Sequence, residues 1–156
     1  MQAVLLIGIQ ASGKSSFFKE RFFDTHVRIN LDMLRTRHRE RLLLEACLEA
    51  KQPFVVDNTN PSAADRARYL AAAREAGFEV HGYYFRSVLA EALPRNAQRE
   101  GRQKIAEAGL RGTAARLQQP RLDEGFDTLF YVRLVPAEEG EDHAQARFEV
   151  SPWTPE

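Results

Sequence analysis

An eight-residue stretch near the N-terminus, "GIQASGKS" from Gly8 to Ser15, constrains the fold of this chain more than any other feature. It follows the apolar run Ala3–Ile7, which has the length of a strand, and it precedes the helix-like stretch "SFFKERFF". The two glycines allow the backbone to curl so that successive N–H groups point inward. Because the start of the following helix adds its positive end, this arrangement predicts a phosphate-binding loop.

The loop fits the pattern G-x-x-x-x-G-K-[ST] between a strand and a helix, and this setting predicts a nucleotide site. Lys14 is expected to reach the β- and γ-phosphates, and the Ser15 hydroxyl is expected to ligate a metal. We therefore predict ATP and Mg²⁺ as cofactors. The ATP-binding residues predicted within the loop are Gly8, Gln10, Ala11, Ser12, Gly13, Lys14, Ser15 and Ser16. The pattern alone does not distinguish a motor, a switch and a kinase.

Apolar runs alternate with helix-like segments along the chain, which predicts an α/β fold with a parallel sheet of about five strands and helices on both faces. We expect the P-loop NTPase or kinase fold in a single domain over residues 1–156. The strands are predicted at Ala3–Ile7, Val27–Ile29, Phe54–Asp57, Glu79–Phe85 and Thr128–Leu134, with a further edge strand at Arg147–Val150.

Helices are expected between these strands. The first begins inside the phosphate loop, and its phenylalanines Phe17, Phe18, Phe22 and Phe23 are expected in the core. The later helices are predicted at Leu31–Ala50 with Asn30 as its N-cap, from Asn60-Pro61 to Gly77, at Val88–Arg99, and at Thr113–Gln118.

Asp32 is the candidate catalytic base. It lies in the first turn of a predicted helix that follows a short strand, and in parallel α/β folds the carboxyl ends of strands gather at the ligand crevice. Transfer to an alcohol needs a carboxylate that orients the hydroxyl and accepts its proton. The alternative is that Asp32 only stabilises the helix start. Arg35 lies one turn further on and is expected to face the same cleft, where it would bind an acceptor that carries a phosphate.

A second polar cluster follows the apolar strand in "FVVDNTN". Asp57 has the position of a carboxylate that holds Mg²⁺ through water. Asn60 is expected to act in turn chemistry or as an N-cap.

Arginines gather in the segment of about residues 95–118, which we interpret as a lid. Arg95, Arg99 and Arg102 are spaced by four and three, so they are expected on one helical face. Arg95 and Arg99 are predicted to bind ATP, with Arg99 neutralising charge in the transition state. The alternative is a solvated basic helix. A second charge cluster is the acidic tail at about residues 136–156.

The overall composition excludes several classes of protein. The 22 basic and 22 acidic residues balance, which argues against a histone-like nucleic-acid binder. The single cysteine, Cys47, excludes an intramolecular disulfide framework. The chain shows neither a signal peptide nor an apolar run approaching the ~20 residues of a membrane span. We expect a cytoplasmic protein with no membrane partner and no obligate protein partner.

Four stretches resemble the kinase domain of the polynucleotide 5′-hydroxyl kinase family, of the phage and mammalian end-healing type. They are "NLDMLR", "VVDNTNPSAADRARYLAAAREAG", "RNAQRE" and "QPRLDEGFDTL", and the resemblance covers about Val4 to Leu134. It implies that Lys14 and Ser15 take ATP and Mg²⁺ and that Asp32 is the general base. It also implies that Arg35 and Asn58 bind the acceptor, that Asp57 lines the metal site, and that Arg99 with Arg95 acts from the lid.

Three functions therefore stand as hypotheses. The first is ATP-dependent phosphoryl transfer to a 5′-hydroxyl end of DNA or RNA, with nucleic acid as the partner. The anionic acceptor would meet a cationic face made by Arg35, Arg37, Arg39 and the lid segment. The second is a kinase for a small-molecule hydroxyl, such as a nucleoside, sugar, nucleotide sugar or antibiotic. The third is a nucleotide-binding regulatory module or a chaperone-like ATPase, which would not require Asp32 and Arg99 to face one another across the phosphates.

Overall fold

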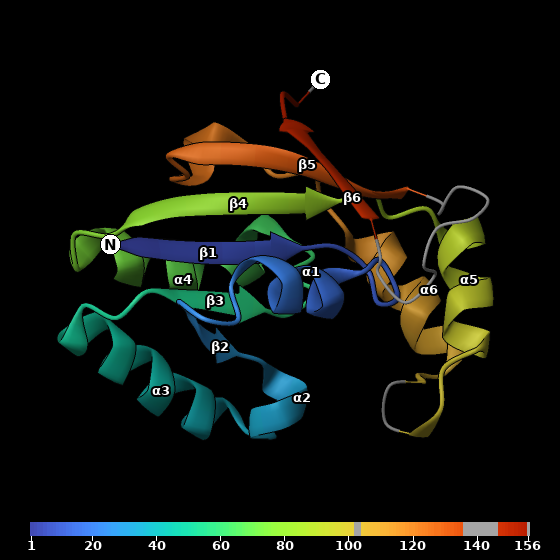
Figure 1. The fold of residues 1–156 in the computed structure, drawn as a ribbon, viewed down its shortest axis with the longest axis horizontal. Coiled ribbons are helices and arrows are strands. Elements are labelled where there is room, and N and C mark those ends of the chain that lie inside the picture. Colours follow the sequence, from blue (N-terminus) through green and yellow to red (C-terminus); the bar gives the residue numbers. More distant parts are fainter. Residues whose placement is uncertain (102–103, 136–146, 156) are drawn as a thin grey trace.

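A six-stranded sheet in the order β2-β3-β1-β4-β5-β6 forms the centre of the computed structural model, which describes residues 1–101, 104–135 and 147–155 (Figure 1). Its strands are β1 (Gln2–Ile7), β2 (Val27–Ile29), β3 (Phe54–Asp57), β4 (Glu79–Phe85), β5 (Thr128–Val135) and β6 (Arg147–Pro152). The first five are parallel, as predicted, and β6 pairs antiparallel with β5. The predicted edge strand is thus confirmed as β6.

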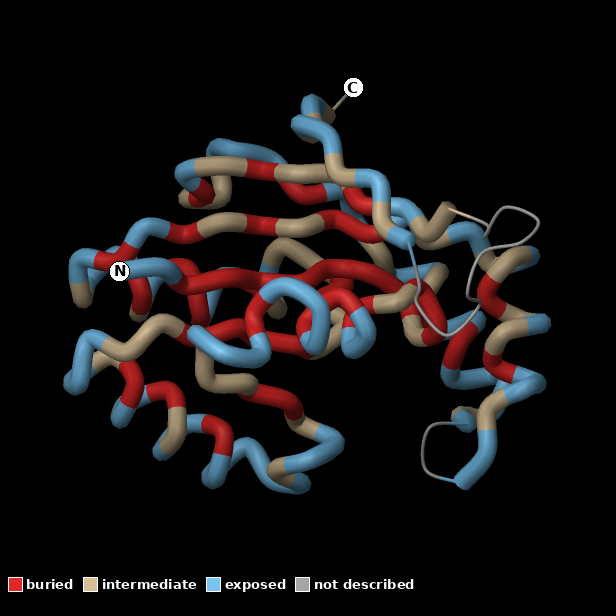
Figure 2. The backbone as a smooth tube through the Cα atoms, in the orientation of Figure 1, coloured by how far each residue is buried: buried red, intermediate tan, exposed pale blue. Residues whose placement is uncertain are grey.

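Alternating side chains of β1 pack into two separate hydrophobic clusters, one on each face of the sheet. Leu5 and its same-face neighbours contact helices α3 (Arg37–Ala50) and α4 (Ala63–Glu75). Leu6 and its neighbours contact helix α1 (Lys14–Arg21) and β6. Because β1 is buried on both faces, its sequence is a continuous apolar run, and Figure 2 shows the buried positions concentrated in the central strands.

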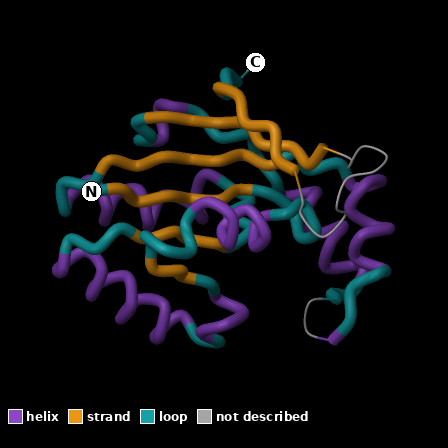
Figure 3. Tube along the Cα trace, viewed as in Figure 1, coloured by secondary structure: helices purple, strands orange, loops and turns teal. Residues whose placement is uncertain are grey.

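The remaining helices lie beyond the carboxyl ends of the strands (Figures 1 and 3). They are α2 (Leu31–Leu34), α5 (Leu89–Ala97) and α6 (Glu107–Arg116), while the short 3₁₀ helix η2 (Leu122–Glu124) precedes β5. Helices α5 and α6 form a third apolar cluster with the phosphate loop through Ile9, Ala11, Ala92 and Leu110. In the described part of the chain, no helix combines the length and apolarity needed to cross a membrane.

The predicted helix Leu31–Ala50 is in fact two helices. Helix α2 ends at Leu34 because Arg35 adopts a positive φ of 75°, which cannot continue a right-handed helix. Helix α3 then begins afresh with Thr36 as its N-cap, whose hydroxyl accepts a hydrogen bond from Arg39 N at 3.1 Å. The break means that side chains from Arg35 onward do not follow the helical spacing set by Asp32.

The expected start of the third helix was also wrong. Helix α4 begins at Ala63, with Ser62 as N-cap and Asp65 completing a capping box. Asn60 instead has a φ of 47°, and its buried amide donates to Leu6 O at 2.8 Å. This hydrogen bond ties the loop after β3 to the end of β1.

Two boundaries around the lid segment and one core prediction differ as well. Helix α5 ends at Ala97, so Arg95 and Arg99 do not share a helical face, and Arg102 lies outside the described residues. Helix α6 covers Glu107–Arg116, earlier and longer than the predicted Thr113–Gln118. Of the four phenylalanines, Phe23 is 69% exposed rather than in the core. Most of the predicted acidic tail, residues 136–146 and 156, also lies outside the described residues.

Candidate active site

The phosphate loop joins β1 to α1 with a backbone that only small residues permit. Gly13 is the N-cap of α1 with a φ of 100°, and a Cβ there would lie 3.1 Å from the Leu134 and Phe148 side chains. Neighbouring elements hold the loop at its first two residues: Gly8 N donates to Thr59 O at 3.0 Å, and Ile9 N donates to Ser87 Oγ at 3.1 Å. The loop is therefore anchored independently of any ligand.

Lys14 is buried at the base of this loop. Its Nζ donates to the carbonyl oxygens of Gly8 and Ile9, both at 2.8 Å. The pKa of Lys14 is lowered to about 8, mainly because the group is buried; the nearby Arg99 also lowers this pKa, while the carboxylates of Asp57 and Asp32 raise it. Lys14 is thus an ammonium group that lacks a full counter-charge, as expected of a group that receives phosphates.

The side chains of Asp57 and Ser15 are in contact at the end of β3, where the sequence predicts a metal site. The Ser15 hydroxyl donates to Asp57 Oδ2 at 3.2 Å, and Asp57 is buried. Hydroxyl and carboxylate oxygens are the ligands that Mg²⁺ prefers, so this pair fits the metal. An unpredicted residue, Arg28 of β2, contacts both: its Nε and Nη2 lie 2.9 and 2.8 Å from Asp57 Oδ2, and Nη2 donates to Ser15 Oγ at 3.1 Å.

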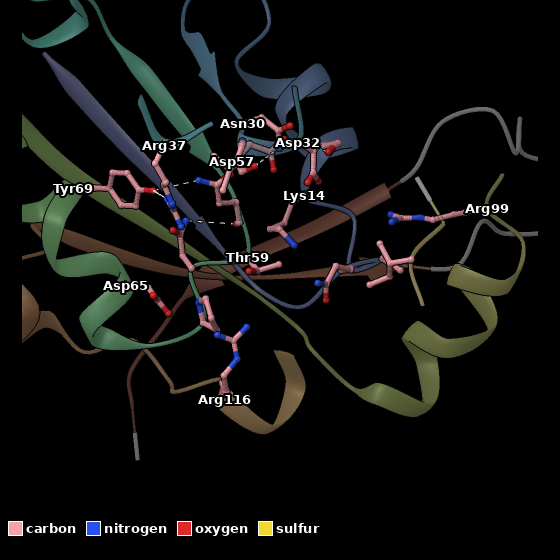
Figure 4. A pocket seen from close by; sticks show the side chains of 18 residues that line it. Lys14, Asn30, Asp32, Arg37, Asp57, Thr59, Asp65, Tyr69, Arg99 and Arg116 are labelled. Atoms are coloured by element: carbon pink, nitrogen blue, oxygen red, sulfur yellow. Dashed lines mark hydrogen bonds between the residues drawn. The ribbon is translucent and has the colours of Figure 1, made fainter. Parts of the chain in front are cut away.

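Two asparagines hold the short helix that carries Asp32. Asn30 accepts from Met33 N at 2.9 Å as the N-cap of α2, and its amide donates to Asp57 O. Asn58 Oδ1 accepts from Leu31 N at 2.9 Å. Asp32 itself is exposed and lines the same pocket as Lys14 (Figure 4). The backbone that carries Asp32 is therefore held against the end of β3, and its side chain lines the pocket that Lys14 also lines.

Both the oxygen and the nitrogen of the Asn58 side-chain amide form hydrogen bonds within the protein. Its Nδ2 donates to Glu40 Oε2 at 3.1 Å and to Tyr69 Oη at 3.3 Å, while its Oδ1 holds Leu31. Glu40 is buried and accepts from Tyr69 Oη at 2.9 Å. Asn58 lines the pocket, but these contacts make it a positioning residue for α2 and α3, in addition to the acceptor-binding role that the sequence resemblance implies.

Arg37, rather than Arg35, lines the pocket among the described residues. The prediction that Arg35 faces the cleft by helical spacing is wrong because α2 ends before it, and Arg35 is exposed. Arg37 Nη1 donates to Glu40 Oε1 at 2.8 Å and to Tyr69 Oη at 3.1 Å, and the side chain remains about half exposed. One edge of its guanidinium is held, which leaves further donors for a ligand.

The lid helices are docked on the phosphate loop. Arg95 Nη1 donates to Ala11 O at 3.3 Å, and Gln10 Nε2 donates to Thr113 Oγ1 at 3.0 Å. Asn96 closes the connection between α5 and α6 by two hydrogen bonds with the Ile105 backbone, at 2.8 and 3.0 Å. Arg99 follows α5 and lines the pocket on the side away from Tyr69 (Figure 4). Burial lowers the pKa of Arg99.

These side chains surround one pocket of about 300 Å³ at the carboxyl ends of β1 and β3. Figure 4 shows Lys14 and Asp32 near its centre, with Arg37 and Tyr69 on one side and Arg99 on the other. The charged residues of its wall are Lys14, Asp32, Arg37, Asp57, Asp65, Arg99 and Arg116. Asp32 and Arg99 thus share the pocket with the phosphate-binding lysine, which is the arrangement that a kinase requires and a binding module does not.

The sequence as a whole matches a known family. A family model described as an AAA domain matches residues 4–120. The chain belongs to this family. Membership implies nucleotide binding at the loop from Gly8 to Ser15, because this is the phosphate-binding loop of P-loop proteins.

A curated relative of the AAA-domain chain is the bifunctional polynucleotide phosphatase/kinase of Schizosaccharomyces pombe. It is 26% identical over 132 residues, which are 80% of this chain and 32% of that protein. The chain thus spans about a third of the length of this relative.

Solved structures share the fold over most of the chain. Kti12 of Chaetomium thermophilum, crystallised in complex with ADP-AlF3, has a TM-score of 0.62 at 15% identity and covers 92% of both chains. A gluconokinase from Sinorhizobium meliloti 1021 has a TM-score of 0.57 at 18% identity, covering 83% of this chain and 82% of that chain. These likenesses confirm the predicted α/β P-loop kinase fold.

Sequence reasoning missed Arg28 and Asp65, and it expected Arg37 and Arg116 only as members of a cationic face that would meet an anionic acceptor. Arg28 could have been noticed, because a charged residue between Val27 and Ile29 in a short strand needs a buried partner. Arg37 and Arg116 carry no comparable local pattern. They enter the pocket only because α3 starts anew after Leu34 and α6 folds back over the loop.

Proposed function

We propose that this AAA-domain chain is an ATP- and Mg²⁺-dependent kinase that phosphorylates the 5′-hydroxyl end of a polynucleotide. The observation that carries the proposal is the placement of Asp32 in the same pocket as Lys14, with Arg37 and Arg116 on the wall beyond. The similarity to the fission-yeast polynucleotide phosphatase/kinase supports the choice of acceptor.

In this reaction Lys14 and the N–H groups of the phosphate loop bind the β- and γ-phosphates of ATP. Ser15 would ligate Mg²⁺ and Asp57 would hold it through water; the metal supplies charge neutralisation between the phosphates. Asp32 accepts the proton of the attacking hydroxyl as the new O–P bond forms and the β–γ bridging bond breaks, releasing ADP. Arg99 faces the same space from the lid side and neutralises the negative charge that develops on the transferred group.

An anionic acceptor fits the two arginines, Arg37 and Arg116, that line the same pocket as Asp32 and that we call the cationic wall. Arg37 is oriented by Glu40 and Tyr69, so little side-chain freedom would be lost when it binds a phosphate. Arg116 lines the same pocket from α6. A polynucleotide whose terminal hydroxyl meets Asp32 would direct its first phosphates to this wall.

A second candidate is a kinase for a small hydroxyl compound. The cavity of about 300 Å³ has the volume of a typical small-ligand site, and a gluconokinase shares the fold. A sugar or nucleoside acceptor would use Lys14, Asp32 and Arg99 in the same roles, but it would not depend on Arg37 and Arg116 for phosphate contacts.

The test is transfer from γ-labelled ATP with Mg²⁺ to a matched set of acceptors. The acceptors are a 5′-hydroxyl oligonucleotide, the same oligonucleotide already 5′-phosphorylated, and panels of nucleosides and sugars. We expect label only in the 5′-hydroxyl oligonucleotide. Asp32→Asn should lower the rate by about 10²–10⁴-fold with ATP binding retained, because only the proton acceptor is removed. Asp24→Asn, at an exposed position of the same chain, is the control.

Each other outcome selects a different function. Label in a sugar or nucleoside and in neither oligonucleotide would establish the small-molecule kinase. ATP binding without label in any acceptor would indicate the regulatory module. Full activity of Asp32→Asn would refute the assignment of the base.

A further inference from the structure

Arg28 places a positive charge where the metal is expected. Its Nη2 lies 2.8 Å from Asp57 Oδ2 and 3.1 Å from Ser15 Oγ, and these two oxygens themselves lie 3.2 Å apart. A second nitrogen, Nε, contacts the same carboxylate oxygen at 2.9 Å. The guanidinium therefore contacts both Ser15 and Asp57, the two residues that we assign to Mg²⁺.

The guanidinium and a hydrated Mg²⁺ compete for the same two groups, because Arg28 already uses Ser15 Oγ and Asp57 Oδ2. A hydroxyl has one proton and two lone pairs; Ser15 donates its proton to Asp57 and uses a lone pair for Arg28. Mg²⁺ lies about 2.0–2.1 Å from its oxygen ligands, so a metal on Ser15 Oγ would stand within a few ångströms of the guanidinium. Repulsion between a single and a double positive charge at that separation, in a partly buried site, opposes simultaneous occupancy.

The burial of the two partners shows which of them can move. The Asp57 side chain is 2% exposed, while that of Arg28 is 29% exposed. Asp57 is fixed at the end of β3, and a buried carboxylate without a partner is costly. Arg28 is long and reaches solvent at one side, and its guanidinium carbon lies 5.8 Å from the ring centroid of Phe18, a contact that accompanies the ion pair with Asp57.

We propose that Arg28 is the counter-ion of Asp57 in the nucleotide-free protein and is displaced from it when Mg²⁺ enters. This inference rests on the metal site of the proposed function. It implies that a divalent cation by itself binds weakly, since it must break the ion pair between Arg28 and Asp57. It also implies that the metal enters together with the triphosphate, whose negative charge attracts Mg²⁺ and gives the released guanidinium a new partner.

The experiment is Mn²⁺ binding to the nucleotide-free protein, followed by the electron paramagnetic resonance signal of free Mn²⁺. Arg28→Met keeps an unbranched apolar side chain at this position but removes the guanidinium and its charge. We expect this variant to bind Mn²⁺ at least about tenfold more tightly than the wild type, because no cation then competes for Asp57. Arg28→Met combined with Asp57→Asn should lose the gain, which would locate the metal at this corner.

The matched control is Arg133→Met, which removes an exposed arginine paired with Glu149 at 2.9 Å on β5 and β6. Equal Mn²⁺ affinity in wild type, Arg28→Met and Arg133→Met would overturn the proposal. The measurement uses neither ATP nor acceptor, so failure of the kinase assay leaves this result interpretable, and failure here leaves the kinase assay unaffected.

Thermal unfolding supplies an independent readout, and Arg28→Gln serves as a second variant if Arg28→Met does not fold without metal. In EDTA we expect both variants to melt below the wild type, because Asp57 lacks its partner. Adding Mg²⁺ should raise their melting temperature more than that of the wild type, because the ligand binds the folded state more tightly. Equal Mg²⁺-dependent shifts in variants and wild type would contradict the competition.

Discussion

At the scale of single residues, the ammonium group of Lys14 has a pKa close to physiological pH. Burial lowers this pKa to about 8, and the group contacts two backbone carbonyls rather than a carboxylate. Bound phosphates favour the charged form, so they raise the pKa in the complex. Nucleotide binding is therefore coupled to proton uptake at any pH at which Lys14 of the nucleotide-free protein is partly deprotonated.

We expect the affinity for ATP to be highest below pH 8 and to fall as the pH rises through this value, by up to about tenfold per pH unit. At pH 8.5 binding should take up a proton, whereas at pH 7 the lysine contributes little. Isothermal titration calorimetry in two buffers of different ionisation enthalpy measures this uptake directly. Lys19→Met, at an exposed lysine of the same helix, should keep the uptake; absence of uptake in the wild type at pH 8.5 would rule out the shifted lysine.

At the scale of elements, the break between α2 and α3 decides which arginine lines the pocket among the described residues. Had one helix continued past Leu34, Arg35 would follow Asp32 on the same face. The positive φ of Arg35 and the cap at Thr36 instead bring Arg37 to the pocket, against Glu40 and Tyr69. The arginine that we propose to bind the acceptor therefore comes from the start of α3.

Arg37→Met should weaken binding of a 5′-hydroxyl oligonucleotide by about 10-fold or more and lower the slope of log affinity against log salt by about 0.7, the value for one phosphate contact on a single strand. Arg35→Met is the control on the neighbouring helix end and should leave this slope unchanged. Fluorescence anisotropy at several salt concentrations measures both quantities. A larger effect of Arg35→Met than of Arg37→Met would restore the assignment made from spacing alone.

At the scale of the whole molecule, Arg66 of α4 connects parts of the chain that are distant in sequence. The side chain is fully buried and pairs with Glu124 at 2.8 Å. It also donates to the carbonyls of Asn60, Pro61 and Gln118 at 2.9–3.2 Å. The loop after β3, the segment after α6 and the 3₁₀ helix η2 therefore share one buried cation.

Arg66→Met should lower the free energy of unfolding by about 3–5 kcal/mol, because Glu124 loses its partner and three carbonyls lose a donor. Urea denaturation followed by circular dichroism measures this change. Arg68→Met, at an exposed arginine of the same helix, should change stability by less than about 0.5 kcal/mol. A loss below about 1 kcal/mol for Arg66→Met would show that the buried pair is not a main support of the fold.

The sequence alone determined the sheet and the phosphate loop, because both depend on residues that are neighbours in the chain. All five predicted parallel strands are present, and β6 was expected as an edge. The central strands β1 and β3 are the clearest in the sequence, because strands buried on both faces form short apolar runs. The loop residues Gly8 to Ser15 could be placed because the pattern carries its own geometry. Asp32 and Asp57 could be placed near it because each follows a parallel strand.

Only the tertiary structure decided which side chains complete the site. The contacts of Arg28 with Asp57, of Asn58 with Glu40 and of Arg37 with Tyr69 join residues 18–32 positions apart. Similar contacts explain why Asn60 does not cap α4, since its amide bonds Leu6 O, and why α6 docks on the phosphate loop through Gln10 and Thr113. The end of α2 at Leu34 was likewise visible only in the folded chain. Local propensity does not detect such contacts, because hydrogen bonds and charges between distant segments outweigh the small preferences of single residues for a helix.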